Sequence, residues 1–140
     1  MIVVDASLAV KWFLPEPGSA EAAQLLDRSD GDIVGPDLLG IEVSATLVRG
    51  ANMVKSNRDE ALKSLAKLKF MVESEAVKLQ RTDIDQQDRA AQLAIDLGHP
   101  LKDCIYLALA MDLQCDLVTC DARFAAKAKE VWAGVRLLGA

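Results

Sequence analysis

The sequence predicts an α/β fold, a three-layer α/β/α sandwich around a central, mainly parallel sheet. Short apolar runs typical of buried strands alternate with longer stretches whose apolar residues recur at helical spacing. Strands that alternate with helices favour parallel pairing, with helices covering both faces of the sheet. The chain has 140 residues, of which 51% are hydrophobic and 26% charged. We therefore expect residues 1–140 to form a single domain with one core.

Two strands and three helices are expected in the first half of the chain. The strands are residues 1–5 and 32–36, and the helices are residues 19–29, 37–50 and 58–72. Asp37 is a possible N-cap of the second helix, and Gly50 lies near its end. Either Ser56 or Asn57 can cap the third helix, whose apolar residues predict an amphipathic segment.

Three further strands and three further helices are expected in the second half. The strands are residues 76–80, 116–120 and 135–139, and the helices are residues 84–98, 101–114 and 122–130. Gly98 suits the end of the first of these helices, because glycine readily adopts the left-handed conformation that ends many helices. Residues 101–114 are mostly apolar, so we expect a central, well-buried helix there.

The composition is that of a globular protein without a membrane segment. The longest apolar stretches, such as residues 104–111, fall far short of the roughly 20 residues that cross a bilayer. The N-terminus lacks the features of a secretory signal, so we expect a cytoplasmic location. Three cysteines, Cys104, Cys115 and Cys120, are an odd number that agrees with a reducing compartment. A zinc site would need His99, the only histidine, and no paired C-x-x-C supports one.

Charge limits the kind of partner that the whole molecule can attract. With 16 basic and 21 acidic residues, the formal net charge is -5. This field should repel nucleic acid at long range. Any nucleic-acid chemistry must therefore be carried by a local site that is assisted by cations.

Two carboxylates stand where buried strands are expected to end. Asp5 follows the apolar run at the N-terminus, and Asp121 follows the run at residues 116–120. In open parallel sheets, ligands gather outside the carboxyl ends of the strands, so these two side chains are candidates for a shared site. Each also has a simpler interpretation as a residue that starts a turn after a strand.

Two more carboxylates lie on helix faces that are otherwise largely apolar. Glu42 has Leu38 and Leu39 one turn before it, and Asp103 shares its face with Tyr106. Both are expected to point toward protected surroundings rather than open solvent. The alternatives are that Glu42 pairs with a neighbouring Lys or Arg, and that Asp103 is an N-cap.

Bringing several carboxylates to one end of a sheet requires compensation. Like charges repel, and taking them out of water is costly unless cations are present. The hard cations Mg²⁺ and Mn²⁺ prefer oxygen ligands and bind through a few carboxylates together with waters and substrate phosphates. Such a site can activate water for attack at phosphorus, so phosphodiester hydrolysis is the chemistry that this pattern favours.

Four segments of the sequence resemble a known family when they are taken together. They read, in order, "VVDASLAVKWFLPEP", "PDLLGIEVSATLVRG", "LKDCIYLALAM" and "LVTCDARF". The set resembles PIN-domain ribonucleases, and in particular the VapC toxins of bacterial type II toxin–antitoxin pairs, over essentially the whole chain. The resemblance implies a PIN-like sandwich, metal-dependent cleavage of RNA, a homodimer, and a cognate antitoxin that covers the active-site groove.

The same resemblance implies a role for individual residues. Four acids would form the catalytic and Mg²⁺- or Mn²⁺-binding site: Asp5, Glu42, Asp103 and Asp121. Asp5 and Asp103 would be the most central ligands, while the other two bind metal directly or through water and one of them orients the attacking water. Ser7 and Thr119 match positions of small hydroxyl residues beside the acids. They would be supporting ligands, or simply turn and cap hydroxyls.

Basic and aromatic residues in the flanking segments are candidates for contact with RNA. The basic candidates are Lys11, Lys102, Arg123 and Lys127, each of which could equally be a solvated surface charge. A positive rim would steer phosphates toward an acidic centre. Trp12 and Phe13 could stack on bases or on a partner peptide, although burial or a dimer contact suits such bulky residues better.

Two kinds of departure from the pattern of the VapC toxins occur, at three positions. Lys102 stands before Asp103 where an aromatic residue is common, and Cys104 and Cys120 stand where alanine, serine or asparagine is common. These departures concern substrate preference more than activity, because they remove no carboxylate. Cys120 could make the site sensitive to oxidation, or be an inert buried thiol.

Other function classes fit the residues less well. A phosphatase that forms an aspartyl-phosphate on Asp5 usually needs a second Asp two positions later, and here Ser7 stands there. A phospho-acceptor receiver needs an Asp after a middle strand, which residues 76–80 do not offer. A protein-binding module that has the fold but lacks catalysis is a further alternative, and the presence of all four acids argues against it.

Overall fold

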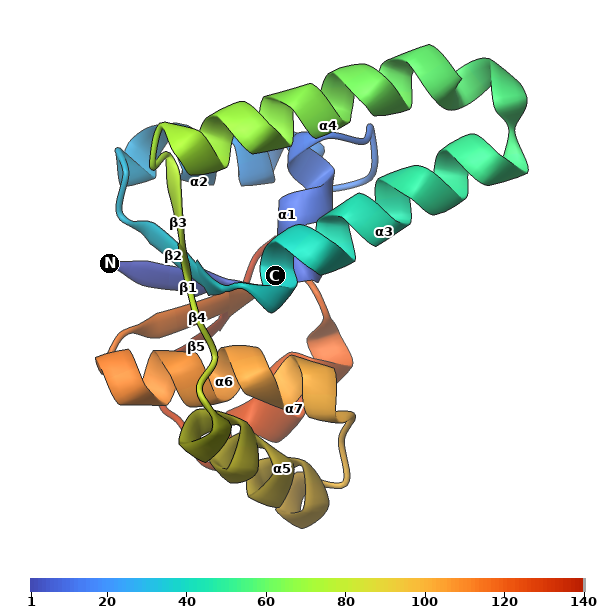
Figure 1. The fold of residues 1–140 in the computed structure, drawn as a ribbon. Coiled ribbons are helices and arrows are strands. Elements are labelled where there is room, and N and C mark those ends of the chain that lie inside the picture. Colours follow the sequence, from blue (N-terminus) through green and yellow to red (C-terminus); the bar gives the residue numbers. More distant parts are fainter. Residues whose placement is uncertain (140) are drawn as a thin grey trace.

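A computed structural model describes residues 1–139, in which five short strands form one parallel sheet (Figure 1). The order across the sheet is β3-β2-β1-β4-β5, and every neighbouring pair is parallel. The strands are β1 (Ile2–Val4), β2 (Ile33–Pro36), β3 (Val77–Gln80), β4 (Asp116–Thr119) and β5 (Val135–Leu137). Each expected strand is present, and the predicted parallel sheet is confirmed.

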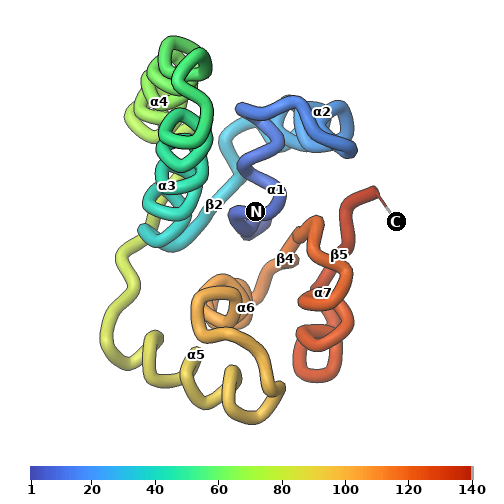
Figure 2. The backbone as a smooth tube through the Cα atoms, turned by 90° about the vertical axis from the view of Figure 1, so that its right-hand side faces the viewer, coloured from blue at the N-terminus to red at the C-terminus, as the bar shows by residue number. Residues whose placement is uncertain are grey.

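Helices cover both faces of the sheet, so the predicted three-layer arrangement is also confirmed. Figures 1 and 2 place α1 to α4 on one side and α5 to α7 on the other. The helices are α1 (Ala6–Ala9), α2 (Ser19–Ser29), α3 (Leu38–Met53), α4 (Arg58–Glu73), α5 (Ile84–Leu97), α6 (Leu101–Leu113) and α7 (Ala122–Ala128). Two 3₁₀ turns, η1 (Val10–Trp12) and η2 (Lys55–Asn57), join them. Within residues 1–139, no helix is both long enough and apolar enough to cross a membrane.

The register of the central strand β1 and its neighbour β4 places their ends side by side. Val4 of β1 is opposite Val118 of β4, and both side chains are buried in the main core. Asp5 and Thr119 follow these two residues at the carboxyl edge of the sheet. The pairing of β1 with β4 therefore sets the position of the first predicted carboxylate before any side-chain contact is considered.

Helix α6 is the central buried helix that its composition predicts. Five consecutive residues, 106–110, are at most 2% exposed. The helix begins after Pro100, which is the N-cap residue and makes no side-chain cap bond. Asp103 therefore lies inside the first turn, and the alternative that it is the N-cap is wrong.

Segment ends differ from the expectations at a few places. Asp37 caps α3 as predicted, but the helix continues beyond Gly50 to Met53. Asn57 precedes α4 without a side-chain cap bond, and Gly98 ends α5 in the left-handed conformation.

The segment that follows β1 folds back on the sheet as two short helical turns, α1 and η1, which the sequence pattern did not predict. Trp12 in η1 is 8% exposed, and its indole N–H donates to the carbonyl of Ala22 at 2.9 Å. Phe13 is partly buried, with the ammonium of Lys67 5.3 Å from its ring centre. Burial, rather than an open stacking platform, is thus the state of Trp12 in this fold.

Candidate active site

The four predicted carboxylates line one cleft of about 400 Å³ at the carboxyl edge of the sheet. Asp5 comes from the end of β1, Glu42 from α3, Asp103 from α6, and Asp121 from the start of α7. These segments are far apart in the sequence, and only the fold brings them together. The predicted grouping is therefore present as a shared cavity wall.

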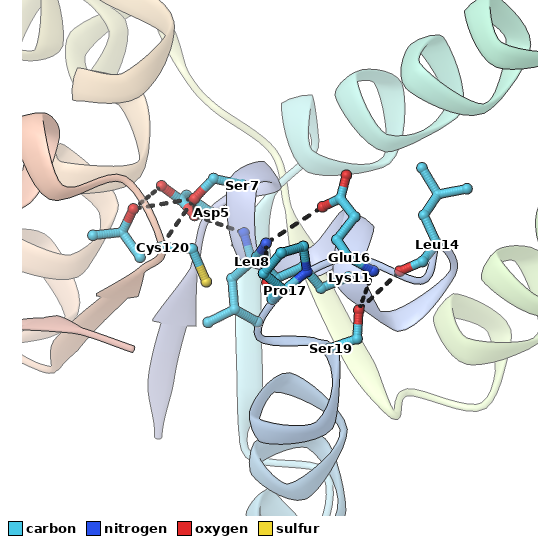
Figure 3. A network of polar contacts seen from close by, with 10 residues as sticks. Asp5, Ser7, Leu8, Lys11, Leu14, Glu16, Pro17, Ser19 and Cys120 are labelled. Carbon is cyan, nitrogen blue, oxygen red and sulfur yellow. Dashed lines mark hydrogen bonds and ion pairs between the residues drawn. The ribbon is translucent and has the colours of Figure 1, made fainter. Parts of the chain in front are cut away.

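Asp5 is the most buried of the four carboxylates, with 3% of its surface exposed. It is the N-cap of α1, and its Oδ1 accepts from the Leu8 amide at 3.2 Å and from the Ser7 hydroxyl at 2.7 Å (Figure 3). Its Oδ2 accepts from the Thr119 hydroxyl. Burial raises the pKa of Asp5 to about 6. The three hydrogen bonds lower this pKa but do not outweigh burial, and the charge of Asp103 adds a small increase.

The two predicted hydroxyl residues, Ser7 and Thr119, join the ends of β1 and β4. Besides donating to Asp5, the Ser7 oxygen accepts from the Cys120 amide at 3.0 Å, and the Thr119 oxygen accepts from the Asp121 amide at 3.1 Å. Each hydroxyl thus fixes a carboxylate and a backbone amide at once. The two interpretations of these hydroxyls, as turn or cap groups and as neighbours of the acids, are therefore compatible.

Glu42 is held from two sides. The buried Tyr106 hydroxyl donates to its Oε1 at 2.6 Å, and the Lys102 ammonium lies 3.7 Å from its Oε2. The pKa of Tyr106 lies far above its usual range, first because of burial, then because of the hydrogen bond to Glu42 and the nearby carboxylate charges. Tyr106 therefore stays protonated and serves as a donor. The alternative that Glu42 pairs with a neighbouring lysine is therefore also realised, through Lys102. This pairing does not exclude Glu42 from the cleft, because both side chains line it.

Asp103 contacts the only histidine of the chain. The Nε2 atom of His99 lies 2.7 Å from the Oδ2 atom of Asp103, and the side chains are 7% and 23% exposed. The imidazole stacks on the ring of Phe124, with ring centres 5.0 Å apart. His99 was considered in the sequence only as a zinc ligand, so this role was missed.

Asp121 caps helix α7, where its simpler interpretation was a residue that starts a turn after a strand. Its Oδ1 accepts from the Phe124 amide at 3.0 Å. The same side chain lines the cleft. Capping and membership of the carboxylate group are therefore compatible.

Of the predicted basic candidates, Lys102 alone lines the cleft. Lys11 donates to the Pro17 carbonyl at 2.8 Å and lies 3.4 Å from Glu16, so it fixes the loop between η1 and α2 (Figure 3). Arg123 is exposed at the start of α7 and does not line the cleft. Lys127, farther along the same helix, does not line it either.

Arg49 is a cleft residue that the sequence analysis missed. It lines the cavity together with Thr46 and Glu42. The signal was available, because residues at positions i, i+4 and i+7 share one face of a helix. Once Glu42 was assigned to the cleft, the face of α3 that it occupies also pointed to Arg49.

The donor chemistry of the cleft suits a hard divalent cation. Its acidic residues offer carboxylate oxygens, and no ion pair in residues 1–139 involves Asp5, so its buried charge would gain from a cation. In the described part of the chain, however, no three Asp, Glu, His or Cys side chains converge closely enough to hold a metal by themselves. A metal here would be held by few carboxylates, with water and phosphate oxygens completing its shell, as Mg²⁺ prefers.

Comparisons with known proteins agree with this fold. A family model described as the PIN domain matches residues 2–130. No curated protein matches the chain. The structure of PAE2754 from Pyrobaculum aerophilum is similar with a TM-score of 0.67 at 18% identity, covering 98% of this chain and 90% of that one. The structure of Mycobacterium tuberculosis VapC20, described as a toxin that cleaves the sarcin–ricin loop, is similar with a TM-score of 0.70 at 14% identity, covering 90% and 94%.

Proposed function

The chain belongs to the PIN-domain family, and from this premise we propose that it is a metal-dependent endoribonuclease, the toxin of a toxin–antitoxin pair. One observation carries the proposal: four carboxylates from four separate segments line a single cleft at the carboxyl edge of a parallel sheet. Residues that only start turns or cap helices would not be expected to line the same cavity. Residues 1–140 would act as one nuclease domain in the cytoplasm.

Asp5 and Asp103 are the residues that we assign to holding Mg²⁺ or Mn²⁺, with Glu42 and Asp121 completing the acidic wall. A bound divalent cation would supply the positive charge that promotes attack of water on a phosphodiester and stabilises the leaving oxygen. Asp5 can take this part because its two hydroxyl partners and the Leu8 amide fix its orientation. Its pKa of about 6 leaves it largely ionised at neutral pH.

The remaining acids are suited to orienting water. Glu42 is fixed through Oε1 by Tyr106 and Asp121 through Oδ1 by the Phe124 amide. A carboxylate whose rotamer is fixed can accept a hydrogen bond from a water at a defined place in the cleft. We assign the attacking water to one of these two side chains.

Arg49 and Lys102 provide the positive charge that the acidic molecule needs near its substrate. Both line the cleft, and Lys102 is 64% exposed at its side chain, so its ammonium can reach a phosphate outside the wall. Phosphate contacts position a nucleic acid without reading its sequence. This interpretation confines attraction of RNA to the cleft and agrees with a net charge of -5.

The toxin assignment adds partners. VapC20 is described as a toxin, and its similarity to this chain is one of fold. Together with the motif resemblance, this similarity supports a cognate antitoxin and a homodimer. Co-expression with the product of the neighbouring gene, followed by purification through a tag on one protein, tests this part. Recovery of a stoichiometric complex that no longer cleaves RNA is expected, and free, active protein would contradict it.

The nuclease itself is tested by a matched pair of substitutions in one helix. Asp103→Asn removes a cleft carboxylate, whereas Asp112→Asn makes the same chemical change at the other end of α6, where Asp112 binds Gln86 and Arg89. Structured and unstructured RNAs are incubated with each protein in Mg²⁺, Mn²⁺ or EDTA. Metal-dependent cleavage that is lost only in Asp103→Asn is expected. Equal cleavage by the wild type and both variants would refute the assignment of the site.

A further inference from the structure

The contact between His99 and Asp103 crosses the start of helix α6. His99 lies just before Pro100, the N-cap residue, and Asp103 lies in the first turn. Their atoms are 2.7 Å apart, and the imidazole is 7% exposed, so little water competes for the hydrogen bond. An ionised carboxylate only accepts, so Nε2 of His99 carries the hydrogen.

The imidazole is itself fixed by helix α7. It stacks on Phe124 with an angle of 18° between the ring planes, and the Phe124 side chain is fully buried. The amide of the same Phe124 donates to Asp121. One residue of α7 therefore orients one cleft carboxylate directly and supports the histidine that binds another.

Asp103 needs such a restraint because its neighbours repel it. Its charge is close enough to Asp5 to raise the pKa of that residue, and it shares the cleft with Glu42 and Asp121. The positive end of the α6 dipole favours the charge of Asp103, but within residues 1–139 its side chain accepts no backbone hydrogen bond that would fix its orientation against this repulsion. His99 supplies this missing partner, because its Nε2 atom binds the Oδ2 atom of Asp103.

We infer that His99 is a positioning residue that holds Asp103 in the orientation required to bind a divalent cation in the cleft. The inference rests on the proposed function, because it concerns the same site. Groups that hydrogen-bond to metal ligands commonly contribute about 10- to 100-fold to metal affinity or activity. His99 would act in this way through Asp103, without touching metal or RNA.

Two amide substitutions separate this role from a merely structural one. Gln at position 99 places its NH₂ group near the place of Nε2, whereas Asn carries the same group one methylene shorter and does not reach Asp103. Both changes lose the stacked ring, so the hydrogen bond is the difference between His99→Gln and His99→Asn. Asp112→Asn, which disturbs an ion pair of α6 outside the cleft, is the control.

The test is the affinity for Mn²⁺ alone, measured by calorimetry on each full-length protein without RNA, with thermal unfolding recorded in parallel. We expect His99→Asn to bind Mn²⁺ about tenfold or more weakly, His99→Gln to stay within a few fold of wild type, and Asp112→Asn to be unchanged. Equal affinity of His99→Asn and wild type would overturn the inference while leaving the proposed function intact. Equal weakening in His99→Gln and His99→Asn would also overturn it, since the hydrogen bond would then not be responsible. Absence of Mn²⁺ binding in the wild type would refute the proposed function and this inference together.

Discussion

Replacing Asp5 with asparagine should stabilise the metal-free protein at neutral pH while abolishing cleavage. Burial raises the pKa of Asp5 from 3.8 to about 6, so the folded state holds the proton more tightly than the unfolded state does. The stability that depends on this proton is present below pH 4 and is lost as the pH rises to about 7. Each pKa unit is worth about 1.4 kcal/mol, so ionised Asp5 costs about 3 kcal/mol at neutral pH.

Asparagine removes the charge and keeps most of the contacts. Its carbonyl can accept from Ser7 and the Leu8 amide, and its NH₂ group can donate to Thr119. We therefore expect Asp5→Asn to raise the free energy of unfolding by about 1 to 3 kcal/mol at pH 7.5, and by about half as much at pH 5. Urea unfolding in EDTA, followed by circular dichroism, measures both values. A loss of stability at pH 7.5, or a gain that does not change with pH, would show that hydrogen bonding outweighs desolvation at this position.

Two further substitutions and the addition of Mg²⁺ test the same site. Thr119→Val leaves an oxygen of Asp5 and the amide of Asp121 without their partner, and should cost about 1 to 3 kcal/mol in urea unfolding; unchanged stability would contradict the importance of this hydroxyl. Tyr106→Phe removes the donor to Glu42, and should lower the cleavage rate with only a small change in melting temperature. An unaltered rate would contradict the claim that Tyr106 positions Glu42. Mg²⁺ at about 100 times its dissociation constant should stabilise the wild type by about 2.7 kcal/mol and leave Asp5→Asn nearly unchanged in thermal unfolding, whereas equal stabilisation of both proteins would place the metal elsewhere.

Strands β1, β2 and β4 were predictable because they contain short apolar runs bounded by acids or turn residues. The helical turns after β1 were missed because α1 has four residues, too few for a periodic pattern. The end of α3 was misplaced because Gly50 suggested a C-cap, whereas a Cβ at this position would meet no atom within 4 Å. Glycine there reflects neither a turn nor a close contact.

The acids of the site were predictable, but most of the groups that orient them were not. Asp5 and Asp121 could be assigned from strand ends, a local signal. Tyr106 was recognised as a neighbour of Asp103 on α6, yet its hydroxyl binds Glu42 on α3, a contact that only tertiary packing creates. The role of His99 depends on the helix start at Pro100 and on the ring of Phe124, which belongs to another helix.

Analysis of the RNA ends tests the central claim most directly, because it reports both the need for metal and the nature of the attacking group. Purified wild-type protein is incubated with end-labelled RNA in Mg²⁺ or EDTA, and the new termini are identified by mass spectrometry. Attack by water predicts linear monophosphate and hydroxyl ends that form only in Mg²⁺. Products with 2′,3′-cyclic phosphate, or cleavage that persists in EDTA, would contradict a metal-dependent hydrolase at this carboxylate cleft.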